Sequence, residues 1–140
     1  MQRLVFDLDY SQPAARIFAY LAEHENLAPL FGTSVRRLRD GSDGHRNGVD
    51  SARELRIGPL PPFEETVVEF VPNELIRYRI THGSPLRDHE GTMRFTASAS
   101  GTNLHYEIVF RAILPGLDAV IAAGLRRNVS RGLARVGALA

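Results

Sequence analysis

An arginine and a glutamate stand where two neighbouring predicted strands could bring their side chains together inside the protein. Arg53 lies in the alternating stretch 49–57, on the same face as Val49, Ser51, Leu55 and Ile57. Glu64 lies in the next alternating stretch, 63–70, on a face shared with Thr66, Val68 and Phe70. Because a buried guanidinium needs a charged partner, we predict an Arg53–Glu64 pair that could bind a carbonyl or carboxylate of a ligand. The alternative is that Arg53 reaches past the sheet edge to water.

Two histidines and a carboxylate lie close together in the segment 81–91, which its turn residues mark as a loop. They are His82, Asp88 and His89, with Arg87 beside them. A histidine next to a carboxylate can transfer protons near neutral pH, and this chemistry suits an enolisable polyketide. A solvated loop without chemistry is the alternative, and the polar composition favours it. The catalytic candidates are therefore His82, His89 and Arg53.

The sequence contains no recognisable metal or cofactor motif. His82 and His89 lack a third ligand at a fixed spacing, so we expect no metal. The other histidines, His24, His45 and His105, are interpreted as surface residues. A glycine-rich phosphate loop, GxSxG and HExxH are all absent from the sequence, which gives no support to nucleotide-dependent, serine-hydrolase or zinc-hydrolase chemistry. We therefore expect no cofactor.

Alternating and helical patterns define the elements that would position these residues. Residues 4–8 alternate between apolar and other side chains and predict a first strand. Two short helices follow, one over 11–22 with an N-cap at Ser11 and one over 25–32. Further strands are predicted at 35–39, 49–57, 63–70, 75–82, 92–97 and 103–112.

Side chains on the inward face of these strands and of the last helix are the candidate ligand-binding residues. They are Arg53, Glu64, Thr66, Tyr78, His82, Met93, Phe95, Tyr106, Ile121, Gly124 and Asn128. Tyr78 and Tyr106 could instead be core tyrosines whose hydroxyls bond to backbone or solvent. Asn128 could line a pocket or make a structural hydrogen bond. A β-bulge would reverse the assignment of every residue beyond it in a strand.

Residues 116–140 form a long amphipathic helical pattern. Apolar residues recur on one broad face of this helix, namely Leu117, Ile121, Leu125, Val129, Val136 and Leu139. Gly124, Asn128 and Gly132 add a row of small or polar residues along that face, although each interior glycine costs about 0.8–1 kcal/mol relative to alanine. Three explanations stay open: another backbone approaches closely, the row leaves room for a ligand, or it forms a homodimer contact.

Composition limits the classes of protein to which the chain can belong. Its 140 residues and 44% hydrophobic content suit one domain over residues 1–140. A net charge of +1 gives no general attraction to nucleic acid. No apolar stretch approaches the ~20 residues of a membrane span, and the N-terminus lacks the pattern of a secretion signal. Since there is also no cysteine, we expect a cytoplasmic protein without nucleic-acid partners or stable membrane insertion.

The element order predicts an α+β fold in which one curved antiparallel sheet is covered by the final helix. A strongly bent sheet cannot touch a straight helix along its whole length. We therefore expect a cavity between the sheet and the C-terminal helix.

A family resemblance is carried by three stretches, SARELRIGPLPPFEETVVEFVPNELIRYRI, SPLRDHEGTMRF and GTNLHYEIVFRAILPGLDAVIAAGLRR. Together with the element order, they resemble the START-like, or SRPBCC, superfamily, with the polyketide cyclase/dehydrase-like bacterial branch as the closest match. The resemblance implies a helix-grip fold, with a seven-stranded antiparallel sheet wrapped around the C-terminal helix and a hydrophobic pocket between them. Members bind lipids, sterols, polyketides or quinones, and some are aromatase/cyclases, so the fold does not fix the activity.

Two functional hypotheses follow. The leading one is a binding protein that encloses a small hydrophobic molecule, such as a lipid, a polyketide or a quinone-like compound. The alternative is a cofactor-independent polyketide cyclase/dehydratase, in which Arg53 and the tyrosines orient carbonyl groups while His82 or His89 transfers protons. A protein-interaction role at the pocket rim is a third class, for which the sequence carries no direct sign.

Overall fold

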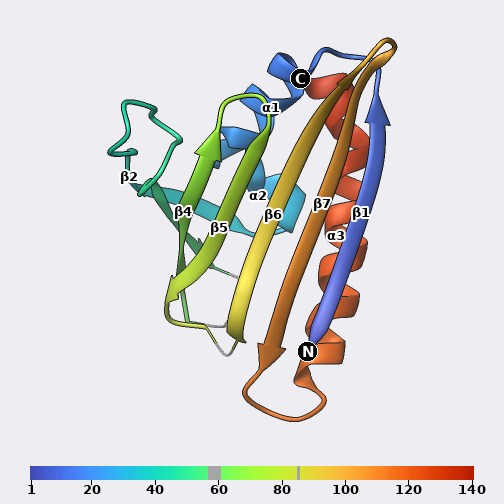
Figure 1. The fold of residues 1–140 in the computed structure, drawn as a ribbon. Helices are drawn as coiled ribbons and strands as arrows, with labels where there is room; N and C mark the ends of the chain where they lie inside the picture. The colour runs from blue at the N-terminus through green and yellow to red at the C-terminus, as the bar shows by residue number, and fades with distance from the viewer. Residues whose placement is uncertain (57–60, 85) are drawn as a thin grey trace.

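The computed structural model describes residues 1–56, 61–84 and 86–140. Ile57, at the end of the predicted strand 49–57, and Pro85, in the predicted loop 81–91, lie outside these ranges. Seven strands form one sheet in the order β1-β7-β6-β5-β4-β3-β2 (Figure 1). The strands are β1 (Gln2–Tyr10), β2 (Ser34–Arg39), β3 (Ala52–Arg56), β4 (Phe63–Val71), β5 (Leu75–His82), β6 (Leu86–Ser98) and β7 (Gly101–Ala112). All neighbouring strands are antiparallel, as the sequence predicts.

The connection from β1 to β2 contains the short helices. They are α1 (Ala14–Ala22), the 3-10 helix η1 (His24–Leu27) and α2 (Ala28–Phe31). The N-cap prediction at Ser11 is wrong, because α1 starts after Pro13, whose extended backbone takes the cap position without a side-chain hydrogen bond. Gly32 ends α2 in the left-handed conformation with φ of 66°, a position where glycine has no steric cost.

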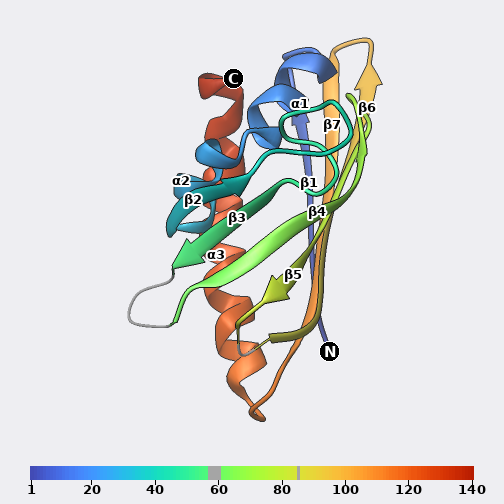
Figure 2. The same ribbon diagram turned by 90° about the vertical axis from the view of Figure 1, so that its left-hand side faces the viewer.

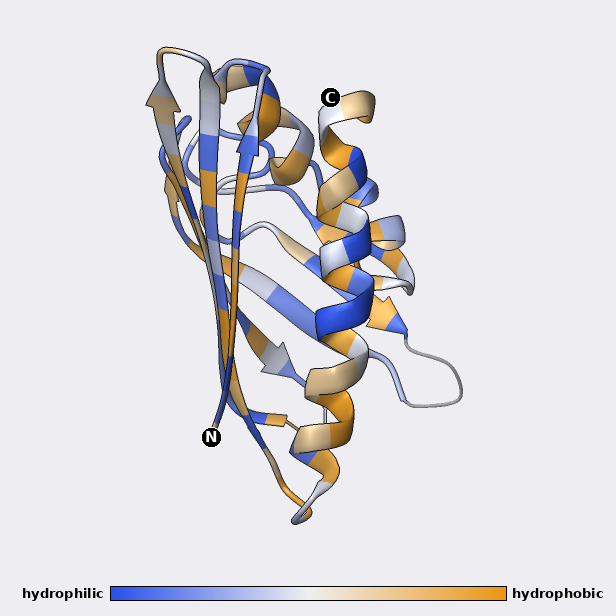
Figure 3. Cartoon of the chain, turned by 90° about the vertical axis from the view of Figure 1, so that its right-hand side faces the viewer, coloured by the Kyte–Doolittle hydropathy of each residue, from blue (hydrophilic) through white to orange (hydrophobic). Residues whose placement is uncertain are grey.

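The C-terminal helix α3 (Leu117–Leu139) lies across the concave face of the sheet (Figure 2). Its buried residues are Ala122, Val129, Leu133 and Val136. The buried face is rotated about the helix axis relative to the predicted one, so that it includes Ala122 and Leu133. Leu139, which was predicted to be buried, is 58% exposed. Figure 3 shows that hydrophilic residues occupy the middle of α3, while most strands alternate between the two kinds. One side of α3 is thus buried in the core, while Ile121 and Gly124 lie on a side that is only partly buried.

Strand β4 contains two irregularities that change which residues face inward. Its register with β5 shifts between Glu64 and Glu65 and again between Val67 and Glu69. Glu65 and Val67 are consequently buried, and Arg53, which pairs with Glu65 across β3 and β4, is buried with them. The predicted inward parity of Glu64 is therefore wrong by one residue.

Strand β6 is longer than predicted. Residues 86–91, expected to be loop, belong to the strand, and Leu86 pairs with Ala112 at the far end of β7. The register shifts between Arg87 and Glu90, where Asp88 has a φ of 52°. This bulge sends Asp88 outward and places His89 on the inner face of the sheet.

Candidate functional site

A cavity of about 200 Å³ lies between the first half of α3 and the ends of β3 to β6. Its walls are mostly apolar. The apolar lining residues include Phe31, Leu55, Phe63, Ile80, Leu86, Ile108, Ile121 and Leu125. Gly124 of α3 also lines the cavity. The polar residues in the wall are Glu65, Tyr78, Ser84, His89 and Asn128. The gap expected between a curved sheet and a straight helix is therefore present.

The two helix glycines have different surroundings. A Cβ atom on Gly124 would have no neighbour within 4 Å, so this residue faces the open cavity. A Cβ atom on Gly132 would lie 2.7 Å from the Cα atom of Leu30, so this residue lets α2 and α3 touch. Two of the open explanations therefore apply, each to one glycine.

Asn128 lies between these two glycines and serves both surroundings. Its Nδ2 atom donates a long hydrogen bond of 3.5 Å to the carbonyl oxygen of Phe31, and its side chain lines the cavity. A Cβ atom on Gly32 would lie 2.9 Å from the same Nδ2 atom. Asn128 therefore combines the two roles that the sequence left open.

A buried ion pair stands at the inner end of the cavity. Arg53 Nε donates to Glu65 Oε1 at 2.9 Å, and both side chains are nearly inaccessible, at 3% and 5% exposure. Arg53 Nη2 lies 2.8 Å from the same oxygen but is not aligned for a hydrogen bond. The guanidinium carbon is 4.7 Å from the centroid of the Tyr78 ring, a cation–π distance. Arg53 is thus buried and paired, but its partner is Glu65 instead of Glu64, and Arg53 itself is not among the residues that line the cavity.

Glu64 and Thr66 point away from the cavity, toward Arg39 and Thr81, although Thr66 is buried. Glu64 pairs with Arg39, with 3.0 Å between Oε1 and Nη1. The Thr66 hydroxyl shares a hydrogen bond of 2.8 Å with the Thr81 hydroxyl. Their predicted inward orientation is wrong because the shift in register at Val67 and Glu69 lets both Val67 and Phe70 face inward, which an unbroken alternation forbids.

The two candidate histidines are separated by the structure. His82 is exposed at the end of β5, and its Nδ1 atom lies 2.6 Å from the carbonyl oxygen of Thr81. His89 is in the cavity wall, with a side chain that is 6% exposed. Its Nδ1 accepts a hydrogen bond of 3.2 Å from the Ile80 N–H. The predicted loop cluster does not exist, since Asp88 instead pairs with Arg111 on β7.

The surroundings of His89 favour the neutral imidazole and one of its two tautomers. Burial lowers the pKa of His89, although the neighbouring Glu65 acts in the opposite direction. Because Nδ1 accepts a backbone hydrogen bond, the ring proton is on Nε2. This Nε2 lies 3.7 Å from Glu65 Oε2, which is too far for a direct hydrogen bond.

Tyr78 and Tyr106 meet hydroxyl to hydroxyl in the core. Both are almost completely buried, and burial holds the pKa of each above its ordinary value. The Tyr78 ring lies over Gly91 of β6, where a Cβ atom would collide with it. Tyr78 also lines the cavity, whereas Tyr106 lies behind it. Both are therefore core tyrosines, but their hydroxyls bond to each other and not to backbone or solvent as expected, and Tyr78 also contributes to the cavity wall.

The remaining candidates divide between cavity and core. Ile121 lines the cavity. Met93 and Phe95 are buried, and the Phe95 ring packs edge-on against Phe18 at 5.0 Å. They are not among the residues that line the cavity, so the structure gives them a packing role.

His24, interpreted from the sequence as a surface residue, is completely buried. Its Nε2 lies 3.0 Å from the Ser51 hydroxyl, which itself donates to the Gly48 carbonyl. Burial, with Arg53 and Arg37 nearby, lowers the pKa of His24 to about 3. His24 begins η1, and the extended backbone of Glu23 separates it from α1, so helical spacing in the sequence does not reveal this burial.

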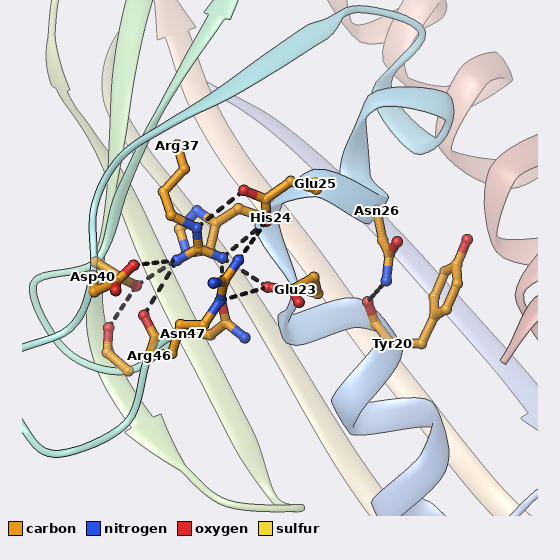
Figure 4. A network of polar contacts seen from close by, with 11 residues as sticks. Tyr20, Glu23, His24, Glu25, Asn26, Arg37, Asp40, Arg46 and Asn47 are labelled. Carbon is orange, nitrogen blue, oxygen red and sulfur yellow. Dashed lines mark hydrogen bonds and ion pairs between the residues drawn. The ribbon is translucent and has the colours of Figure 1, made fainter.

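Arg37 joins η1 to β2 and to the loop after it (Figure 4). Its guanidinium donates to Glu25, to Glu23 at 2.7 Å and to Asn47 at 2.6 Å. The hydrogen bond from Arg37 lowers the pKa of Glu25 to about 2. This network ties the segment around His24 to β2 and to the loop after it.

Neither a metal centre nor a membrane-spanning helix is found in the part of the chain that the structure describes. No group of three or more His, Cys, Asp or Glu side chains there could hold a metal ion. No helix within the described ranges is long and apolar enough to cross a membrane.

A seven-stranded antiparallel sheet curved around a C-terminal helix, with an apolar cavity between them, defines the helix-grip class of proteins. The chain belongs to the family described as polyketide cyclase/dehydrase and lipid transport, whose model matches residues 7–140. The predicted superfamily and fold are thereby confirmed. No curated protein matches the chain in sequence.

Solved structures with the same fold are distant in sequence. A START superfamily protein from Mycobacterium smegmatis is 16% identical, with a TM-score of 0.78 over 99% of both chains. A protein from Thermus thermophilus is 15% identical, with a TM-score of 0.75 over 97% of this chain and 94% of that one. At such identities the likeness shows the shared fold alone.

Proposed function

We propose that the protein binds a small hydrophobic molecule, of lipid, polyketide or quinone-like character, in the cavity between the sheet and α3. The observation that carries the proposal is the apolar cavity of about 200 Å³ beside Gly124. A helix glycine that faces open space gives up about 0.8–1 kcal/mol of helix stability without improving packing. Such a position is explained if the open space has a use.

The size and lining of the cavity limit the ligand. An apolar cavity of ~150 Å³ is enough to hold benzene, so a cavity of about 200 Å³ suits a molecule of one or two rings or a short chain. A larger ligand would have to extend out of the cavity. The walls offer mainly aliphatic and aromatic contacts, which favour uncharged molecules.

Displacement of an apolar dye tests the proposal. We expect N-phenyl-1-naphthylamine to fluoresce on binding and to be displaced by small aromatic or aliphatic compounds. The control is Gly124→Leu, which places a side chain in the cavity and should abolish the signal. A wild-type protein without saturable dye binding would refute the proposal. Native mass spectrometry of the purified protein would show in addition whether an apolar molecule is carried along.

A cofactor-independent cyclase/dehydratase is the second candidate, and one observation favours it. His89, neutral and buried, faces the cavity beside the Glu65 carboxylate, where it could move a proton on a bound β-carbonyl compound. We expect His89→Phe to abolish conversion of a linear poly-β-ketone to an aromatic product, whereas His82→Phe should not. If the wild type leaves such a compound unchanged, the enzymatic candidate is lost and the binding proposal stands. A cytoplasmic location and a homodimer stay predictions.

A further inference from the structure

Two polar side chains in the cavity wall, Glu65 and His89, each have one atom without a hydrogen-bond partner in the described residues, and the chemistry of these two atoms is complementary. Glu65 uses Oε1 for Arg53, and within the described residues its Oε2 accepts no hydrogen bond. His89 uses Nδ1 for the Ile80 N–H, and its Nε2–H has no acceptor in the same part of the chain. Both side chains are at least nine-tenths buried, at 5% and 6% exposure.

The spacing of these atoms leaves room for one further polar atom. Nε2 and Oε2 are 3.7 Å apart, beyond the usual hydrogen-bond range of roughly 2.7–3.2 Å. An atom at hydrogen-bond distance from both would accept from His89 Nε2–H and donate to Glu65 Oε2. Both side chains line the cavity, so such an atom could belong to the ligand.

We propose that the ligand carries a hydroxyl group at its buried end, held between Glu65 Oε2 and His89 Nε2. This inference rests on the proposed binding function and names the class of ligand: a small apolar alcohol, phenol or enol. A hydroxyl is the simplest group that donates and accepts through a single atom. A bare hydrocarbon would leave both protein atoms unsatisfied, which is costly in a dry cavity.

Other ligand groups fit this pair of atoms less well. A ketone or ether oxygen can accept from His89 but leaves the Glu65 carboxylate without a donor. A carboxylate would place a second negative charge beside Glu65. Arg53 Nη2 is a further buried donor without a hydrogen-bond partner in the described part of the chain, but Arg53 is not among the residues that line the cavity, so it does not change this preference.

The first test uses the wild-type protein and a series of naphthalenes that differ at one position. The chain has no tryptophan, so naphthalene fluorescence can be followed directly. We expect 2-naphthol to bind about tenfold or more tightly than naphthalene or 2-methoxynaphthalene, the range expected for hydrogen bonds to a charged group. We expect 2-naphthoate to bind more weakly than 2-naphthol.

Variants then locate the hydroxyl. His89→Phe should reduce the affinity for 2-naphthol about tenfold relative to its affinity for naphthalene, with His82→Phe as the matched control. Glu65→Gln should also weaken 2-naphthol binding, while Glu64→Gln, next to it on the outer face, should have no effect. Circular dichroism of each variant separates loss of binding from loss of folding.

The outcomes separate this inference from the function on which it rests. Equal, saturable binding of 2-naphthol and naphthalene would overturn the hydroxyl inference and leave the hydrophobic cavity in place. Tighter binding of 2-naphthoate than of 2-naphthol would overturn it in favour of an anion site. If none of the naphthalenes binds, the proposed function fails, and the inference fails with it.

Discussion

Substituting alanine at the two glycines of α3 compares an open cavity with a close contact within one helix. A Cβ atom at Gly124 meets nothing within 4 Å, while one at Gly132 lies 2.7 Å from both Cα and Cδ1 of Leu30. The Cδ1 atom can rotate away, but the Cα atom cannot move without α2. The two variants make the same chemical change in different surroundings.

The magnitudes follow from helix propensity and packing. Each variant gains about 0.8–1 kcal/mol, because alanine is the better helix former. Gly132→Ala also carries the cost of overpacking, about 1–3 kcal/mol. Since the propensity term cancels between the two, the difference in their free energies of unfolding should be about 1–3 kcal/mol, with Gly124→Ala more stable than the wild type.

Urea unfolding followed by circular dichroism measures both values, and an unchanged m-value would show that two-state comparison is justified. Equal effects at the two positions would refute the assignment of one glycine to a cavity and the other to a contact. Gly124→Leu extends the test, because it should fill the cavity and prevent dye binding without lowering stability. A Gly124→Leu protein that still binds the dye would place the dye elsewhere.

Three further predictions concern the polar core. Arg53→Met should lower the free energy of unfolding by about 3–5 kcal/mol, since it leaves the buried Glu65 charge unpaired. Arg39→Met, in the more exposed pair with Glu64, should lower it by less than about 1 kcal/mol. Equal losses for the two variants in urea unfolding would contradict this expectation. Tyr78→Phe and Tyr106→Phe should each cost about 1–2 kcal/mol, and the double variant less than their sum, because both remove one hydrogen bond; strict additivity would argue against the bond. His24 is neutral in the folded protein because its pKa is lowered to about 3. Between about pH 6.5 and 3 the unfolded chain takes up a proton at His24 that the folded protein does not, so the free energy of unfolding falls by about 1.4 kcal/mol for each pH unit of acidification. His24→Gln should flatten this decline in urea unfolding between neutral pH and about pH 5, and an unchanged slope would disprove the role of His24.

The strands with strict alternation could be predicted from the sequence because burial on one face imposes a period of two. In β7, Leu104, Tyr106, Ile108 and Phe110 are all buried, as their spacing indicates. The same reasoning correctly predicted that Arg53 faces the inner side of the sheet and is buried. The start of α3 was also predictable, since Pro115 and Gly116 directly precede its first residue, Leu117.

The polar end of the cavity could not be predicted, because it depends on bulges that leave no sign in the sequence. In β4, Phe70 faces inward, so an unbroken alternation predicts that Glu64 also faces inward. Because the register shifts between Val67 and Glu69, Glu65 faces inward instead. In β6, the residues around His89 are too polar to show alternation, and only pairing with the long β7 makes them a strand. Glu65 was therefore found only with the structure, whereas His89 was a catalytic candidate from the sequence and the structure was needed to separate it from His82 and place it in the cavity wall.

The glycine pattern was informative but ambiguous. The positions of Gly124 and Gly132 showed that something other than ordinary packing occurs on α3, and the neighbours that distinguish cavity from contact come from other elements. Such information about tertiary neighbours is absent from local spacing.

Equilibrium titration of the wild type and Gly124→Leu with 2-naphthol tests most directly whether the space beside Gly124 is a ligand site. We predict saturable binding of one molecule per wild-type chain and no binding to a fully folded Gly124→Leu protein. Absence of saturable binding to the wild type, or equal binding to both proteins, would contradict the account.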